Sequence, residues 1–129
     1  MIDRTNVAAL IPCYFEERHI RDVATRVKAQ LDTVLVIDDG STDRTSEEAK
    51  AVGVEVLRQD PNQGKGAAIK RGLTELGARD RIEYILILDG DGQHLPEEIP
   101  RFLDEANRSG AAMLVGNRMT DLERMPWVR

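Results

Sequence analysis

The chain has 129 residues, enough for one domain with a sizeable core, and its 32% charged and 41% hydrophobic residues are typical of a globular protein. Its 18 basic and 23 acidic residues give a net charge of −5, which disfavours a general nucleic-acid-binding role. Apolar runs are short, so no membrane span or signal peptide is predicted, and the single cysteine, Cys13, excludes an internal disulfide and fits a reducing cytoplasm.

Short apolar runs alternate with helical patterns along the chain, which predicts βαβ units and a mostly parallel sheet. Three of these runs are continuous Val/Ile/Leu stretches, as expected for strands covered on both faces. The expected strands are residues 7–11, 33–37, 54–57, 84–88 and 112–115. The predicted fold is therefore a single α/β domain over residues 1–129, with three layers and helices flanking the sheet.

The segments between the strands predict four helices. The first, over residues 17–31, repeats apolar side chains at i, i+3, i+4 and i+7. The second follows the N-capping side chains of residues 41–43 and ends near Gly53. The third runs over residues 64–76, and the fourth begins at Leu95-Pro96, with proline at the first helical position.

The first predicted strand leads into a loop, residues 12–17, that carries two aromatic side chains. Pro12 is expected to end the strand, because it has no N–H to donate to the ladder. Tyr14 then lies at the carboxyl edge of the sheet, where parallel α/β proteins bind ligands, and its ring could stack on a base. The alternative is that Tyr14 and Phe15 only cover the core.

The second predicted strand ends in two adjacent acids, Asp38 and Asp39, before a turn at Gly40. An ionised carboxylate only accepts hydrogen bonds, so it can bind the N–H groups of a base or the hydroxyls of a ribose. The alternative is that these acids cap the following helix. We favour capping for Asp43 and ligand binding for at least one of Asp38 and Asp39.

The third loop, residues 62–68, contains two glycines and opens a helix, a combination that suits close approach of the backbone to an anion. It is not a P-loop, because Lys65 is followed by Gly66 rather than Ser or Thr, and Gln59 stands where the first glycine belongs. It is not a dinucleotide fingerprint either, because Ile69 replaces the third glycine. A plain glycine-rich turn is the alternative.

The fourth loop, residues 89–94, places two carboxylates one residue apart at the end of an apolar strand. Asp89 and Asp91 can share one hard divalent cation, Mg²⁺ or Mn²⁺, which would neutralise a phosphate-bearing ligand. An EF-hand is excluded, because His94 stands at the position that requires glycine. Metal binding is our preferred interpretation, and His94 alone is more often a residue that begins a helix than a ligand.

In order along the chain, these segments resemble the catalytic domain of family 2 glycosyltransferases, which has the Rossmann-like GT-A fold. The similarity is greatest to the branch of dolichol- and undecaprenyl-phosphate sugar transferases, and it covers nearly all of the chain. The segments that carry it are Ile11-Pro12-Cys13-Tyr14-x-Glu16, Val36-Ile37-Asp38-Asp39-Gly40-Ser41-x-Asp43-x-Thr45, Asn62-x-Gly64-Lys65-Gly66-Ala67, Asp89-x-Asp91-Gly92-Gln93-His94-x-Pro96 and Val115-Gly116-Asn117-Arg118.

The resemblance implies roles for residues of all four loops. Residues implied to hold the donor nucleotide, from its base and ribose to its diphosphate, are Pro12, Tyr14, Glu16, Asp38, Asp39, Lys65, Gly66, Asp89 and Gly90. Residues implied to contact Mg²⁺ or Mn²⁺ are Asp89, Asp91 and Gln93. No catalytic residue is assigned within the chain.

The implied reaction is metal-dependent transfer of a sugar, with inversion, from a GDP- or UDP-linked donor to an acceptor. A polyprenyl phosphate at a membrane, as in the synthesis of cell-envelope glycans, is one such acceptor. It needs little help from a general base, because a phosphate monoester is already anionic near pH 7, with a second pKa of about 6. A hydroxyl acceptor would need a base, and no convincing candidate is present in the sequence.

The sequence departs from the family pattern in two ways. Phe15 stands where the family usually has asparagine. The chain also stops at Met125-Pro126-Trp127-Val128-Arg129 with no closing helix, so we expect a fragment of a longer protein. We expect this chain to bind a nucleoside diphosphate weakly, to transfer no sugar unaided and to self-associate as a homo-oligomer. Its expected location is cytoplasmic, at the inner face of a membrane through segments outside this sequence.

Two other classes of function remain open at this point. A sugar-1-phosphate nucleotidyltransferase also uses an α/β sheet with acidic metal ligands, but it usually opens with a glycine-rich first loop, which residues 12–16 are not. The second alternative is a non-catalytic module that binds a nucleotide sugar.

Overall fold

The computed structural model describes residues 2–91, 96–109 and 113–115. Within them, five strands form one sheet in the order β3-β2-β1-β4-β5, and every neighbouring pair is parallel. The strands are β1 (Val7–Cys13), β2 (Thr33–Asp38), β3 (Glu55–Arg58), β4 (Tyr84–Ile87) and β5 (Met113–Val115). The helices are α1 (Ile20–Lys28), α2 (Thr45–Val52), α3 (Lys65–Gly77), the short 3₁₀ helix η1 (Pro96–Glu98) and α4 (Ile99–Ser109). The predicted α/β fold with a parallel sheet is confirmed.

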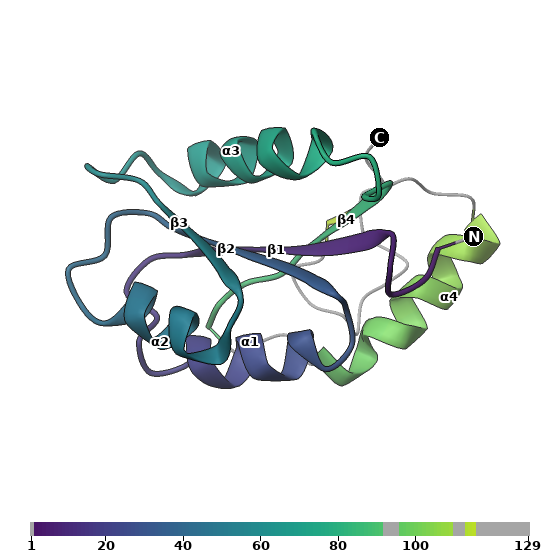
Figure 1. Cartoon of the computed structure of the whole chain (residues 1–129), viewed down its shortest axis with the longest axis horizontal. Helices are drawn as coiled ribbons and strands as arrows, with labels where there is room; N and C mark the ends of the chain where they lie inside the picture. Colours follow the sequence, from purple (N-terminus) through teal and green to yellow (C-terminus); the bar gives the residue numbers. More distant parts are fainter. Residues whose placement is uncertain (1, 92–95, 110–112, 116–129) are drawn as a thin grey trace.

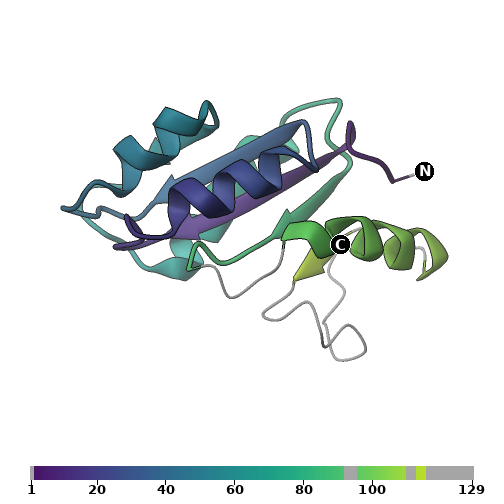
Figure 2. The same cartoon turned by 90° about the horizontal axis from the view of Figure 1, so that it is seen from below.

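Helices cover both faces of the sheet. Figure 1 shows α3 along one face and α1 with α2 along the other, and Figure 2 shows α4 beside α1 on that second face. The side chains of β1 alternate between these layers: Ala9 and Ile11 pack in the cluster that contains α1 and α4, whereas Ala8 and Leu10 pack in the cluster that contains α3. This alternation is the period-two pattern of a strand, and it produces the predicted three layers.

The interior of β1 and β2 is almost completely apolar and buried, which makes these strands the rigid centre of the sheet. β3 is an edge strand whose first and last residues are exposed. Within the described part of the chain, no helix is long and apolar enough to cross a membrane.

The prediction that Pro12 ends the first strand is wrong, because β1 continues to Cys13 and pairs Pro12 with Ile37 of β2. The Cys13 carbonyl accepts a hydrogen bond from the Asp39 N–H on the β2 side, whereas the Leu10 carbonyl accepts one from Leu88 on the β4 side. Alternation therefore turns the Pro12 nitrogen toward β4. The proline ends the pairing with β4 and leaves the pairing with β2 intact.

The first helix is shorter than predicted. It spans Ile20–Lys28, because residues 16–19 form a turn in which the Glu16 carbonyl accepts from the N–H groups of His19 and Ile20. The predicted helical face is nevertheless buried, including Leu31, which lies beyond the helix end and donates its N–H to the Val27 carbonyl. The hydrophobic pattern therefore identified the buried face, and the turn shifted the boundary.

Candidate functional site

A cavity of about 320 Å³ lies at the carboxyl ends of the central strands. Its wall comes from the loops after β1, β2, β3 and β4, as the sequence predicts for a parallel sheet. From the first loop, the predicted residues Pro12, Tyr14 and Glu16 line it. From the other loops, the predicted residues that line it are Asp39, Lys65, Asp89, Gly90 and Asp91.

Asp39 is a buried carboxylate in the cavity wall, with 5% of its surface exposed. It accepts hydrogen bonds from Gln59 Nε2 at 2.9 Å, from the Gln63 N–H at 2.7 Å and from the Gly64 N–H at 2.8 Å. Burial alone would raise the pKa of Asp39, but these three donors hold its pKa below the usual range. Asp39 is therefore an ionised group that fixes the loop in front of α3.

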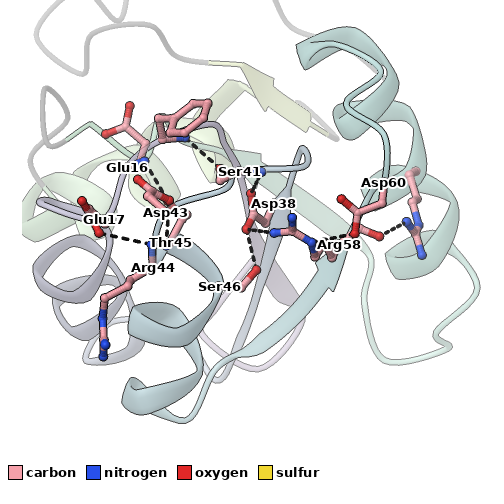
Figure 3. A network of polar contacts seen from close by, with 12 residues as sticks. Glu16, Glu17, Asp38, Ser41, Asp43, Arg44, Thr45, Ser46, Arg58 and Asp60 are labelled. Atoms are coloured by element: carbon pink, nitrogen blue, oxygen red, sulfur yellow. Dashed lines mark hydrogen bonds and ion pairs between the residues drawn. The ribbon is translucent and has the colours of Figure 1, made fainter.

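Asp38 does not line the cavity. Its carboxylate is fully buried and accepts from the Ser41 N–H at 3.1 Å, from the Ser46 hydroxyl and from Arg58 Nη1 at 3.1 Å (Figure 3). Arg58 also donates to Asp60, at 2.7 Å. The three partners of Asp38 belong to the β2–α2 connection, to α2 and to the end of β3. Asp38 therefore connects these segments beside the cavity.

Lys65 is the first residue of α3 and reaches across the cavity to Asp89 of the β4 loop, with 2.7 Å between Nζ and Oδ1. The lysine side chain is 58% exposed and the Asp89 side chain 22% exposed, so the ion pair faces solvent. Gly66, which was also predicted to bind the nucleotide, is not part of the cavity wall. The predicted glycine-rich loop, residues 62–68, therefore contributes Gly64, Lys65 and Ala68 to the wall.

The β4 loop lies directly against the end of β1. A Cβ atom added at Gly90 would lie 2.5 Å from Cys13 Sγ, so a larger residue there would displace the loop. Asp89 and Asp91 both line the cavity from this loop. The predicted ligand Gln93, together with His94, lies outside the described residues, as do segments 116–118 and 125–129.

The carboxylates of the cavity suit a hard cation only when oxygen atoms of a bound ligand complete the coordination of the cation. Among residues 2–91, 96–109 and 113–115, no three His, Cys, Asp or Glu side chains lie close enough together to hold a metal ion. Asp89 and Asp91 supply two carboxylates at one cavity. Mg²⁺ is commonly bound by one or two carboxylates together with phosphate oxygens of a substrate, so this pair fits such a cation.

Cys13 lines the cavity, although no role in the site was predicted for it. Burial raises the pKa of its thiol well above the ordinary value, and the negative charges of Glu16, Asp38, Asp89 and Asp91 act in the same direction. The thiol therefore stays protonated at neutral pH and is a poor nucleophile. The period-two pattern that places Ala9, Ile11 and Cys13 on one face of β1 was the available signal for its burial.

Two hydroxyls that sequence reasoning missed hold the loop after β1. The Ser41 Oγ accepts from the Phe15 N–H at 2.8 Å, and the Thr45 Oγ1 accepts from the Glu16 N–H at 2.9 Å (Figure 3). Thr45 in turn donates both its N–H and its hydroxyl to the Asp43 carboxylate. The N-cap of α2 is Arg44, which makes no side-chain cap bond, so Asp43 supports the start of the helix from one residue before the N-cap. No short-range sequence signal links residues 15 and 41.

Comparison with known proteins identifies relatives of the chain. The family model "Glycosyl transferase family 2" matches residues 8–124. A dolichol-phosphate mannosyltransferase from Pyrococcus furiosus is 30% identical over 95% of this chain and 37% of its own length. A polyprenol monophosphomannose synthase from Mycolicibacterium smegmatis is 32% identical over 93% of this chain and 49% of its own length. The chain thus spans about half or less of these two relatives.

The chain is also similar to solved structures. The chain is similar to glucosyl-3-phosphoglycerate synthase from Mycobacterium tuberculosis in complex with Mn²⁺ and UDP-glucose, with a TM-score of 0.61 and 26% identity. That match covers 74% of this chain and 37% of the other. A mannosyl-3-phosphoglycerate synthase from Rubrobacter xylanophilus is also similar, with a TM-score of 0.58 and 25% identity.

Proposed function

The chain belongs to glycosyl transferase family 2, and from this premise we propose that its cavity binds the nucleoside diphosphate part of a sugar donor with a divalent cation. One observation carries the proposal: an aromatic ring, a buried carboxylate, a lysine and the Asp89-x-Asp91 pair line the same cavity at the carboxyl edge of the sheet. These groups match the chemistry of a base, a ribose and a diphosphate.

The base and ribose are assigned to the β1 and β2 side of the cavity. Tyr14 offers a half-exposed ring for stacking, and Pro12 and Glu16 lie beside it in the wall. Asp39 already accepts three hydrogen bonds. A carboxylate has about four acceptor positions, so one remains for a base N–H or a ribose hydroxyl.

The diphosphate is assigned to the β4 side. Lys65 can exchange Asp89 for a phosphate oxygen, because a solvent-exposed ion pair contributes only about 0–1 kcal/mol. Asp89 and Asp91 would hold the cation, Mg²⁺ or Mn²⁺, with Gln93 as a further proposed ligand. When bound, the cation supplies Lewis-acid stabilisation of the diphosphate leaving group.

For the whole reaction we propose inverting transfer of the sugar to a polyprenyl phosphate. Two relatives support this acceptor: one is a dolichol-phosphate mannosyltransferase and the other a polyprenol monophosphomannose synthase. Such an acceptor would place the reaction at a membrane surface. The proposed donor is GDP- or UDP-linked, and we expect the chain to self-associate.

A thermal-shift panel tests the proposed binding. We expect UDP or GDP to raise the melting temperature in Mn²⁺ and to have little effect in EDTA. At a ligand concentration of 100 Kd, the stabilisation is about 2.7 kcal/mol. Nucleoside triphosphates with sugar 1-phosphates are the matched set for a nucleotidyltransferase. Stabilisation by that set alone, or by no nucleotide at all, would contradict the proposal.

A further inference from the structure

The loop after β1 contains an unusual backbone conformation. Phe15 has φ 54°, in the left-handed region, and it is the one non-glycine residue with positive φ among those described. For a bulky side chain this region is strained, whereas asparagine and glycine adopt it more readily. Strain of this kind persists only where the surroundings determine it, and it gathers at functional sites.

Two buried hydroxyls determine the conformation. The Phe15 and Glu16 N–H groups donate to Ser41 and Thr45, whose residues are 1% and 0% exposed (Figure 3). Both acceptors belong to the segment between β2 and α2 or to the first turn of α2. The strained residue is therefore fixed from the neighbouring part of the fold, and its own side chain does not need to be buried.

The conformation brings two rings together at the mouth of the cavity. The Phe15 and Tyr14 ring centroids are 4.5 Å apart with an interplanar angle of 72°, an edge-to-face contact. Tyr14 lines the cavity and Phe15 does not. Both residues are about half exposed, at 50% and 46%, so the ring contact lies at the surface, where it can restrict the rotamers of Tyr14.

We propose that Phe15 is a positioning residue: its ring braces Tyr14 so that the tyrosine meets the base of a bound nucleotide in one orientation. The inference rests on the proposed function, in which the base lies against Tyr14. Asparagine or glycine would adopt φ 54° with less strain, but neither has a ring to contact Tyr14. The ring contact is therefore what phenylalanine contributes at this position. Phe15 acts through Tyr14 and is expected to make no essential contact with the diphosphate.

A double-mutant cycle tests this mechanism. Tyr14→Leu, Phe15→Leu and the double variant would be titrated with UDP, GDP and inorganic pyrophosphate in Mn²⁺ by calorimetry. We expect Phe15→Leu to weaken binding of the preferred nucleoside diphosphate about threefold to tenfold, the range of an aromatic pair contact. Pyrophosphate affinity should not change. In the Tyr14→Leu background, Phe15→Leu should have no further effect.

The controls separate the brace from folding and from the proposed function. Phe15→Asn removes the ring but suits the backbone, so it should weaken nucleoside diphosphate binding as much as Phe15→Leu while folding at least as well. The proposed role of Phe15 would be wrong if the parent and Phe15→Asn bound the nucleoside diphosphate equally well. It would also be wrong if Phe15→Leu reduced the affinity as much in the Tyr14→Leu background as in the parent. If the parent binds neither UDP nor GDP more tightly than pyrophosphate, the base site of the proposed function fails instead.

Discussion

The two acidic segments at the carboxyl edge of the sheet have similar sequences and different environments. After β2, the adjacent Asp38 and Asp39 are both buried and accept hydrogen bonds from neighbouring segments. After β4, Asp89 and Asp91 are separated by one residue, and both line the open cavity. Asp38 connects the loops beside the cavity and Asp39 fixes the loop before α3 from the cavity wall, whereas Asp89 and Asp91 line the cavity together, where we propose that they hold a cation.

Strand alternation explains the difference. Neighbouring residues on a strand point to opposite faces, so Asp38 meets Ser46 of α2 while Asp39 meets the Gly64 N–H at the start of α3. Asp89 and Asp91 lie beyond the end of β4, in a loop that brings both carboxylates to the cavity wall.

The largest expected effect is on the ligand-facing pair. Asp91→Asn keeps the shape of the side chain but removes the charge that a hard cation prefers. We expect it to weaken Mn²⁺-dependent nucleoside diphosphate binding by more than the roughly 10–100-fold typical of an outer-shell substitution. Calorimetric titration measures this loss, and circular dichroism should report an unchanged fold. Unchanged affinity would remove Asp91 from the metal site, and extensive unfolding would make it structural.

The matched change in the other segment should affect stability instead. Asp38→Asn places an amide N–H₂ group in a fully buried position whose partners, including Ser46 and Arg58, are all donors, so we expect a loss of about 2–3 kcal/mol in the free energy of unfolding. Urea denaturation provides the value, with Asp91→Asn as the control that should change it little. A variant as stable as the parent would show that the buried network contributes no net stability.

Gly90 tests how closely the β4 loop must approach β1. Gly90→Ala places a methyl group against Cys13, so we expect about 1–3 kcal/mol of destabilisation and weaker metal-dependent binding. Gly77→Ala is the control, because nothing lies within 4 Å of a Cβ at that helix end. If the two variants unfold at the same urea concentration, the close packing at Gly90 does not constrain the loop.

A smaller effect concerns acid stability. The pKa of Asp39 is lower in the folded chain, so its contribution is present above the unfolded value near 4 and is lost as pH falls through the folded pKa. Asp39→Asn should be less stable than the parent at pH 7, and the difference should shrink below about pH 4. The pKa of Asp43 is also lowered, so the Asp39→Asn variant still loses some stability at acid pH. A constant difference between the two proteins from pH 7 to pH 2 would contradict this assignment.

Much of the site was predictable from local pattern, because strand ends of a parallel sheet must meet at one edge. That rule was enough to bring Tyr14, Asp39, Lys65 and Asp91 to a single cavity. The structural position of Asp38 was also within reach, since period-two alternation separates it from its neighbour. The sequence predicts ligand binding for at least one of Asp38 and Asp39, and only Asp39 lines the cavity.

Other features depend on tertiary contacts that local pattern does not encode. The positive φ of Phe15 follows from hydrogen bonds to Ser41 and Thr45, some 26 to 29 residues away along the chain. The continuation of β1 beyond Pro12 depends on which neighbouring strand the missing N–H would face. Both require the sheet order, which propensity and spacing do not supply.

The central claim is that the β4 carboxylates hold a cation and diphosphate while the base lies on the Tyr14 side. Anomalous diffraction from crystals grown with Mn²⁺ and the preferred nucleoside diphosphate tests it most directly. We expect a manganese peak at the Asp91 carboxylate, with phosphate oxygens completing its coordination and the base beside Tyr14. A manganese peak away from both Asp89 and Asp91, or a nucleotide bound with its base at the β4 loop, would contradict it.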